Sequence, residues 1–403
     1  MTTSADLVQL DLYPQLSPNV PSSGGPSNAA DPLIPFAEFF AGIGLVRAAL
    51  EPLGFRPMWA NDIEPMKQAH YVANHSPDGF LLGDVTDVHA DQLPRGLELA
   101  TSSFPCIDLS LAGKRTGLAG EHSGMFWEFA RVITELKQQE RVPRAILIEN
   151  VTGFASSHDG KDLQLALAKL KELGYSCDIL TIDASHFVPQ SRQRMFIIGI
   201  SGELPTGCIT GVPPLSDVRP NWVRNAYLKN LLTARLHYRP LPPLPTRTVD
   251  LSDIVEKIED SDIRWWNSDR LAAFMNSLSP IQAARLEGFR TSQKKTWRTA
   301  YRRTRNGKAT WEIRRDDIAG CLRTTGGGSS KQALVVAGHG EVQVRWMTAR
   351  EYAGLMGAKD YQLHGVTPNQ AQFGFGDAVV VDVVHWIGKH YLLPVLRPLP
   401  QLI

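Results

Sequence analysis

The sequence predicts an α/β protein, built on a doubly wound and mostly parallel sheet into which a smaller second domain is inserted. Two observations predict this class. Between residues 35 and 201, short apolar runs alternate with amphipathic stretches, as they do in repeated strand–helix–strand units. Beyond residue 201 the alternation gives way to proline-rich connections, tryptophans and basic residues, and a helix-like pattern returns after residue 346.

The expected elements follow one another in the order that such a sheet requires. Strands are expected at 36–40, 56–61, 79–85, 97–104, 144–150, 175–183 and 194–200. Helices are expected at 44–53, 64–75, 123–140 and 160–173, with Gly174 as a C-terminal cap. Residues 1–34 are rich in Pro, Ser, Gly and Asn, which predicts a disordered arm. After this arm we expect a first domain at 35–201, an inserted domain at 202–345 and a C-terminal return at 346–403.

Composition narrows the class of protein further. The 403 residues are 43% hydrophobic and 21% charged, as in ordinary globular proteins. No apolar run approaches the roughly 18 residues that span a bilayer, and the N-terminus lacks the pattern of a secretory signal. The four cysteines are widely spaced and form no paired metal-ligand motif. These features favour a cytoplasmic protein without a membrane segment, a disulfide framework or a metal site.

Glycines and acids at the ends of the first three strands indicate a site for an adenosine. Gly42 and Gly44 follow the first strand, where glycine allows a tight turn and close approach of a ligand. Asp62 ends the second strand 18 residues after Gly44, near the spacing of about 20 at which an acid meets ribose hydroxyls. Asp84 ends the third strand, where it could accept a hydrogen bond from an adenine amino group. Each feature alone also fits a plain strand–helix turn or a helix N-cap.

Reactive residue types follow the next two strands. Cys106 comes directly after a proline, where the fourth strand ends and a glycine-rich loop begins. Lys114 and Arg115 in that loop could favour the thiolate of this cysteine or meet a phosphate. Glu149 ends a strongly apolar run, so desolvation should raise its pKa and let it donate a proton near neutrality.

A third polar group enters the last strand of the first domain. Gln190, Arg192 and Arg194 stand at alternating positions, which places all three on one face of an extended segment. Arginines in such a row could bind a carboxylate or a phosphate.

Eight short motifs stand in a fixed order along the chain. They are EFFAGIG, NDIEP, GDV, FPC, ENV, PQSRQR, REYAGLMG and GFGDAVVV, and they span roughly residues 36–390. In this order the chain resembles the DNA cytosine-5 methyltransferases, of the bacterial or phage modification type. The resemblance implies the Rossmann-like fold of S-adenosylmethionine-dependent methyltransferases, with a target-recognition domain as the inserted part.

The resemblance also implies which residues bind the cofactor and which act on the base. The cofactor contacts would be Phe40, Gly42, Gly44, Asp62 on the ribose, Ile63, Asp84 on the adenine, Phe104 and Ala378. Cys106 would add to carbon 6 of a cytosine while Glu149 holds or protonates nitrogen 3, which makes carbon 5 nucleophilic. Arg192 would support the base or Glu149. The ring faces must be reached, so the cytosine is expected to flip out of the helix.

A basic segment lies where this family keeps its recognition domain. Residues 290–315 hold ten Lys or Arg against one Glu, a charge of +9, so the rest of the chain carries −8 to give the net +1. Trp297, Tyr301 and Trp311 are interleaved with these cations, as in nucleic-acid binders, although a solvated hairpin or helix face fits as well. The expected DNA contacts are Lys114, Arg115, Arg194, Arg298, Arg302, Arg303, Arg305 and Lys331.

The chain departs from the family pattern at two positions. Ile107 stands where the family commonly has Gln, which removes a polar contact from the loop. Asp377 stands in the closing motif where Asn is usual. In the preceding motif, Arg350 and Glu351 could join the two domains, contact the backbone or form a structural ion pair.

Three other functions compete with this interpretation. The same scaffold could methylate cytosine in transfer RNA, or the two departures could mark a catalytically degenerate DNA-binding homologue. A nicotinamide oxidoreductase is disfavoured because Arg47 replaces the third glycine of the dinucleotide fingerprint. Double-stranded DNA is the expected partner of a monomer, with a companion restriction endonuclease as a further partner.

Overall fold

The computed structural model describes residues 33–105, 124–305, 308–324 and 331–397, without the side chains of 304–309. The predicted arm therefore lies outside the described residues, apart from its last two. Ile34 of that pair begins the first strand, two residues before the expected start, because it pairs with Phe55 of the next strand and is buried.

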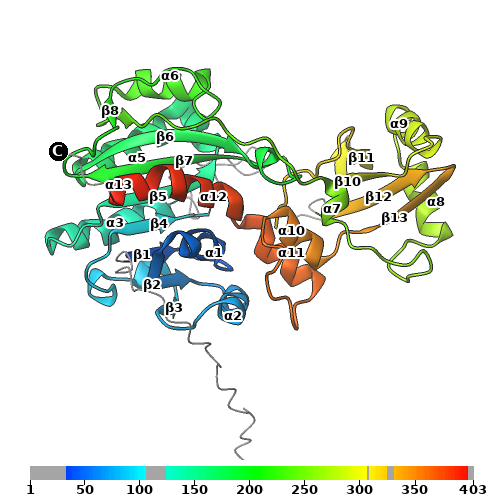
Figure 1. Ribbon diagram of the computed structural model, residues 1–403, viewed down its shortest axis with the longest axis horizontal. Coiled ribbons are helices and arrows are strands. Elements are labelled where there is room, and N and C mark those ends of the chain that lie inside the picture. The colour runs from blue at the N-terminus through cyan, green and yellow to red at the C-terminus, as the bar shows by residue number, and fades with distance from the viewer. Residues whose placement is uncertain (1–32, 106–123, 306–307, 325–330, 398–403) are drawn as a thin grey trace, which may run out of the picture. The chain divides into compact units, whose positions relative to one another are not determined.

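The predicted fold class is confirmed. Seven strands form one sheet in the order β3-β2-β1-β4-β5-β7-β6, and the neighbours β3 to β5 pair in parallel (Figure 1). Only β7 runs antiparallel, to both β5 and β6. Their bounds are β1 Ile34–Phe39, β2 Phe55–Asp62, β3 Phe80–Leu82, β4 Leu99–Ser102, β5 Ala145–Val151, β6 Tyr175–Asp183 and β7 Gln193–Ser201. All seven expected strands are present.

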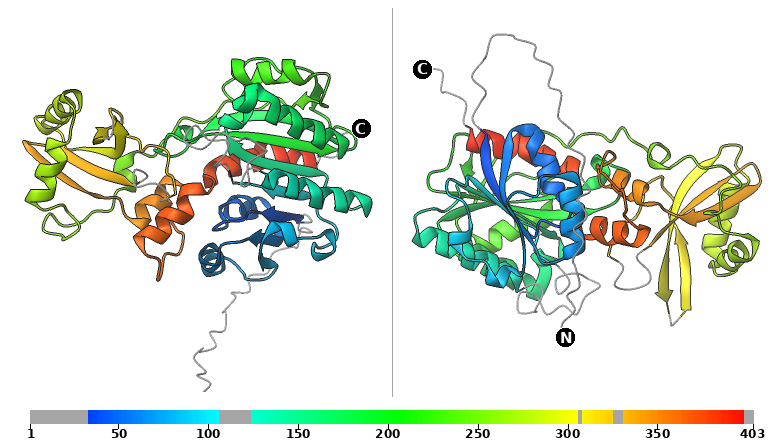
Figure 2. Two further views of the ribbon diagram at one scale, coloured as in Figure 1. Left: turned by 180° about the vertical axis from the view of Figure 1, so that it is seen from behind. Right: turned by 90° about the horizontal axis from the view of Figure 1, so that it is seen from below.

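Helices cover both faces of this sheet (Figures 1 and 2). They include α1 Leu45–Leu50, α2 Pro65–Asn74, α3 Met125–Gln138, α4 Gly153–Ser156, α5 Lys161–Glu172 and, near the C-terminus, α12 Val381–Ile387. Alternation along β1 divides the core, as the period of two in a strand requires. Phe36 packs in the cluster of α1 and α12, whereas Ala37 and Phe39 pack in the cluster of α3 and α5. The four expected helices are confirmed.

A second sheet follows in the chain. It is antiparallel, in the order β11-β10-β12-β13, and two helices pack on its aromatic face. Its elements are α8 Ser268–Asn276, α9 Pro280–Arg290, β10 Thr296–Arg305, β11 Lys308–Ile313, β12 Gln332–Gly338 and β13 Glu341–Trp346. Between the sheets lie β8 Ile209–Thr210, α6 Asn221–Asn230, β9 His237–Tyr238 and α7 Leu251–Ile254. The domain limits proposed from the sequence stay predictions.

The C-terminal segment returns to the first sheet. It holds α10 Ala349–Leu355, α11 Pro368–Asp377, α12 and α13 Leu393–Leu396. The stretch Pro368–Leu396 is long and apolar enough to cross a membrane, but 61% of its apolar window is buried inside the protein, as in a core helix. Asp178 of β6 helps to hold this return, because its fully buried carboxylate accepts a hydrogen bond of 3.0 Å from the hydroxyl of Tyr391. The same carboxylate accepts a hydrogen bond of 2.6 Å from Tyr227 of α6.

Candidate active site

The glycine loop after β1 has the backbone that its sequence requires. Gly42 and Gly44 have φ of +58° and +80°, the left-handed region that glycine enters without strain. A Cβ at Gly44 would lie 2.6 Å from the ring of His75, whereas a Cβ at Gly42 would meet nothing within 4 Å. Phe40 also has a positive φ, of 57°, which costs a side-chain-bearing residue conformational energy. The loop is therefore held tightly at Gly44 and faces open space at Gly42.

The two predicted acids stand at the same edge of the sheet. Asp62 accepts hydrogen bonds from the backbone N–H groups of Gly42 and Glu64, at 2.8 and 3.0 Å, so it ties β2 to the glycine loop. Asp84 accepts the N–H of Thr86 at 2.9 Å as the N-cap of a short helix, one of the roles that the sequence left open. Ile63, directly after Asp62, exposes 58% of its surface. Polar and apolar groups thus remain accessible at this edge.

Sequence reasoning missed a buried carboxylate in β1. Glu38 is 1% exposed, and neither of its carboxylate oxygens has a hydrogen-bond partner among the described residues. Burial raises the pKa of Glu38 to about 8, although the charge of nearby Arg47 lowers it. The signal was present in the sequence, because a charged residue stands inside the apolar run FAEFF.

Glu38→Gln is expected to stabilise the protein in a pH-dependent way. Glu38 keeps its proton in the folded state up to about pH 8, whereas the unfolded chain releases it near the ordinary value of 4.5. Wild-type stability should therefore fall as pH rises between these values, and the variant should lack this fall. We expect a gain of roughly 4 kcal/mol at pH 8 and almost none at pH 4.5. Urea denaturation at several pH values measures it, and an equal effect at every pH would contradict the assignment.

Phe104, two residues before the predicted nucleophile Cys106, is held by aromatic packing and by the side-chain amide of Asn150. Cys106, Lys114 and Arg115 themselves lie outside the described residues. The ring of Phe104 packs against those of Phe126 and Phe154, each with centroids 5.8 Å apart. Its carbonyl accepts a hydrogen bond of 3.1 Å from Nδ2 of Asn150, in the ENV motif. The two reactive motifs are therefore joined two residues before Cys106.

Glu149 is buried beside an arginine. It is 8% exposed, near the end of β5, and its Oε1 lies 2.9 Å from Nε of Arg194. Antiparallel pairing brings the two together, since Val151 of β5 stands opposite Arg194 of β7. Burial raises the pKa of Glu149, and the charges of Arg194 and Arg192 only partly offset this. The residue can therefore hold a proton at higher pH than an ordinary glutamate.

Arg192 holds two segments of the C-terminal part of the chain, and the role that the resemblance implies for it stays a prediction. Its Nη1 donates to the carbonyls of Leu322 and Gly376, at 2.9 and 3.2 Å, and its Nη2 donates to that of Ala378 at 2.7 Å. It thus clamps two C-terminal segments, and it acts on Glu149 through its charge. The ion pair with Glu149 comes from Arg194, which the sequence analysis placed on DNA.

Gln190 also bonds to the backbone of the C-terminal part of the chain. Its Oε1 accepts the N–H of Leu322 at 3.0 Å, and its Nε2 donates to the carbonyl of Leu355 at 2.8 Å. The alternating row of Gln190, Arg192 and Arg194 therefore holds the chain near Leu322 against the first sheet.

Cys321 contacts the two arginines that lie near Glu149. Sγ of Cys321 lies 3.4 Å from Nη1 of Arg192 and 3.8 Å from Nη2 of Arg194. Burial raises the pKa of this thiol, but the two arginine charges outweigh it and hold the pKa below its ordinary value. Only the tertiary structure reveals this contact, because 127 residues separate Cys321 from Arg194.

Comparison with known proteins identifies the family. A model described as C-5 cytosine-specific DNA methylase matches residues 34–392. The chain belongs to this family. M.HhaI, a type II methyltransferase of Haemophilus parahaemolyticus, is 26% identical over 358 residues, which cover 87% of this methylase and 92% of M.HhaI.

Other matches are partial or concern the fold alone. The type II methyltransferase M.DsaV of Dactylococcopsis salina is 34% identical over 165 residues, 41% of this chain and 45% of that protein. The match therefore spans less than half of that relative. The crystal structure of the Dnmt2 methyltransferase of S. pombe has a TM-score of 0.58 at 18% identity, covering 90% of this chain and 99% of that one. This last likeness is one of fold.

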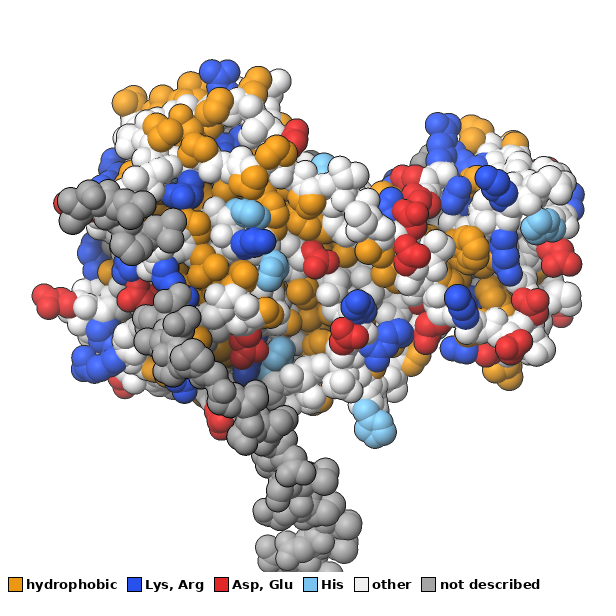
Figure 3. All heavy atoms as spheres, viewed as in Figure 1, with side chains coloured by type: hydrophobic (Ala, Val, Ile, Leu, Met, Phe, Trp, Pro, Cys, Tyr) orange, Lys and Arg blue, Asp and Glu red, His pale blue; other side chains and the backbone are white. Residues whose placement is uncertain are grey.

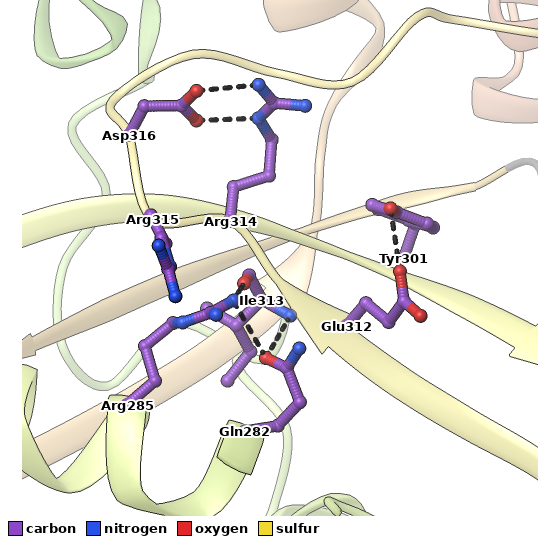
Figure 4. Close-up of a pocket in the computed structure, with 8 residues that line it drawn as sticks. All are labelled: Gln282, Arg285, Tyr301, Glu312, Ile313, Arg314, Arg315 and Asp316. Atoms are coloured by element: carbon purple, nitrogen blue, oxygen red, sulfur yellow. Dashed lines mark hydrogen bonds and ion pairs between the residues drawn. The ribbon is translucent and has the colours of Figure 1, made fainter.

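Ion pairs neutralise part of the positive charge of the basic segment 290–315. Acids just outside the segment neutralise part of it, since Glu287 and Asp316 pair with Arg290 and Arg314, each at 2.7 Å or less. Figure 4 shows Arg314 turned onto Asp316 at a pocket of about 260 Å³, with Arg315 nearby. In Figure 3 the Lys and Arg side chains over β10–β13 are interspersed with acids and apolar groups.

The predicted DNA contacts in this sheet have distinct surroundings. Arg298 is partly buried, its guanidinium 4.7 Å from the ring centroid of Phe289, and Arg303 pairs with Glu312 at 3.3 Å. Arg302 is exposed. Nζ of Lys331 donates to the side chain of Asn369 in α11. The side chain of Arg305 lies outside those described.

Proposed function

We propose that this methylase transfers a methyl group from S-adenosylmethionine to carbon 5 of a cytosine flipped out of double-stranded DNA, through a covalent adduct on Cys106. One observation carries the proposal. Glu149 is a buried acid paired with Arg194, and its neighbour Asn150 holds the carbonyl of Phe104, two residues before Cys106. This arrangement suits acid-assisted nucleophilic attack on a ring.

The residues after β1, β2 and β3 fit S-adenosylmethionine. The backbone at Gly42 faces open space, Ile63 offers an exposed apolar surface, and Asp84 keeps one carboxylate oxygen without a hydrogen bond to a described residue. Asp62 would hold the ribose and Asp84 the adenine, with Phe40, Gly44, Phe104 and Ala378 around them. When bound, S-adenosylmethionine supplies an electrophilic methyl group.

The residues of the chain then activate the cytosine. The thiolate of Cys106 adds to carbon 6, and Glu149 gives its proton to nitrogen 3, so the electron pair moves to carbon 5 and makes it a nucleophile. Arg194 orients the Glu149 carboxyl through its contact of 2.9 Å. After methylation a base removes the proton from carbon 5, and the Cys106–carbon bond breaks as the ring regains its double bond. Both ring faces are needed, which is why the base must leave the stack.

DNA is the substrate we favour over transfer RNA. The family description names DNA, the relatives reported above include type II methyltransferases, and Arg298, Arg302 and Arg303 lie on one strand, β10. We further propose that the enzyme acts as a cytoplasmic monomer and that a companion restriction endonuclease reads the same DNA sequence.

Methyl transfer from labelled S-adenosylmethionine tests this function directly. Wild type and Cys106→Ala are incubated with plasmid DNA and, separately, with transfer RNA, and 5-methylcytosine is mapped at base resolution. We expect the wild type to methylate one short DNA motif and the variant, which still binds DNA, to be at least about 10³-fold slower because it lacks the nucleophile. Turnover by Cys106→Ala near the wild-type rate would refute the covalent mechanism. Transfer to RNA alone would move the substrate to transfer RNA.

A further inference from the structure

Asp377, which stands where the family usually has Asn, forms an ion pair with Lys67. Oδ2 of Asp377, the last residue of α11, lies 2.8 Å from Nζ of Lys67 in α2, although 310 residues separate them in the chain. The Lys67 side chain is only 12% exposed, and its ammonium lies 5.4 Å from the ring centroid of Phe373 in α11. A lysine so enclosed needs a compensating charge. The carboxylate at 377 supplies it, and a neutral Asn would not.

Each residue of the pair lies close in the sequence to a proposed cofactor contact. The helix of Lys67, α2, follows the end of β2 directly, with Asp62 and Ile63 just ahead of it. Asp377 precedes Ala378, whose carbonyl is held by Arg192. Electrostatically, Lys67 interacts most strongly with Asp377 and next with Asp62. A change in the net charge of this pair would therefore change the electrostatic potential at the edge that would hold S-adenosylmethionine.

The ligand itself changes charge in the reaction. S-adenosylmethionine carries a sulfonium, an ammonium and a carboxylate, a net charge of +1, whereas S-adenosylhomocysteine lacks the sulfonium charge and is neutral overall. A cation left uncompensated at this edge repels the first compound and has little effect on the second.

We propose that the Lys67–Asp377 pair neutralises the wall of the cofactor site and thereby sets the preference of the site for the cationic cofactor over its neutral product. The inference rests on the proposed function, since it takes S-adenosylmethionine as the ligand. Asp377 and Lys67 are positioning residues here, with no direct part in the chemistry. The pair also accounts for the Asp in place of the usual Asn.

Equilibrium binding without DNA tests the proposal. Dissociation constants for S-adenosylmethionine and S-adenosylhomocysteine are measured by calorimetry at low salt for the wild type, Asp377→Asn, Lys67→Met and the double variant. Asp377→Asn should weaken binding of S-adenosylmethionine about fivefold to tenfold and that of S-adenosylhomocysteine about twofold or less. Lys67→Met should shift the ratio in the opposite direction, and the double variant should restore it. All shifts should shrink at high salt.

The control is Asp360→Asn, which removes a carboxylate from an exposed position near α10; its two dissociation constants should equal those of the wild type. If Asp377→Asn and Lys67→Met weaken both ligands equally, the pair is merely structural and the inference is wrong, while the proposed function stands. If the wild type binds neither compound, the cofactor assignment of the proposed function fails and the inference falls with it.

Discussion

Glu149→Gln is expected to lower kcat for cytosine methylation by about 10²- to 10⁴-fold, the usual contribution of a positioned general acid. Gln occupies nearly the same volume and can still meet Arg194, but it has no proton to give to nitrogen 3. The variant should still bind DNA and S-adenosylmethionine. Single-turnover methyl transfer beside binding measurements separates the two effects.

The pH dependence gives this prediction a second readout. Glu149 must be protonated to act as the acid, so wild-type kcat should fall as pH rises through its raised pKa. This descending limb should be absent from the profile of Glu149→Gln. Because the pKa of Glu149 is raised in the folded state, ionising this residue costs the folded protein stability above its ordinary pKa, so the Gln variant should be at least as stable as the wild type at pH 7.5. A strong loss of stability would instead indicate a structural role, and Glu172→Gln on the surface serves as control.

Glu351→Ala is expected to destabilise the protein by about 3–5 kcal/mol, the cost of leaving a buried charge without its partner. Arg345 and Glu351 are both 0% exposed, and Nη1 of Arg345 donates to Oε2 of Glu351 at 2.9 Å. The same carboxylate accepts the N–H groups of Thr348 and Glu256, at 2.8 and 2.9 Å. Its removal therefore also breaks one half of the capping box of α10 and leaves the N–H of Glu256, just after α7, without this acceptor.

The urea midpoint of the first unfolding transition measures this effect. Glu341→Ala, an exposed residue at the start of β13, is the matched control and should change little. The double variant Arg345→Met/Glu351→Leu should recover much of the lost stability, because it removes both charges together. A midpoint of Glu351→Ala equal to that of the control would mean that this ion pair adds nothing to stability.

The order of elements and the candidate cofactor edge could be predicted from the sequence alone. Apolar runs with a period of two and amphipathic stretches with a helical period are local properties. All seven strands of the first sheet and four of the five α-helices described before residue 201 could therefore be assigned, and only the short α4 was missed. The positions of Gly42, Asp62 and Asp84 at strand ends followed directly, since parallel strands bring their carboxyl ends to one edge.

Which charges meet was decided only by the tertiary structure. The resemblance suggested that Arg192 supports the base or Glu149, and this role stays a prediction. The contact between Glu149 and Arg194 was not foreseen, because it depends on the register between β5 and β7. For Arg350 and Glu351 the sequence left open a link between the domains, backbone contacts or an ion pair with each other. In the structure Glu351 pairs with Arg345, while Arg350 donates to the carbonyl of Tyr361.

The same holds for residues far apart in the chain. No local sequence pattern could have predicted the contact between Lys67 and Asp377 or the one between Cys321 and Arg194. Hydrophobic periodicity is written into neighbouring residues, so the sequence by itself determined the elements and the class of site. Partnership between charges depends on strand register and on the packing of distant segments, and only the folded chain sets these.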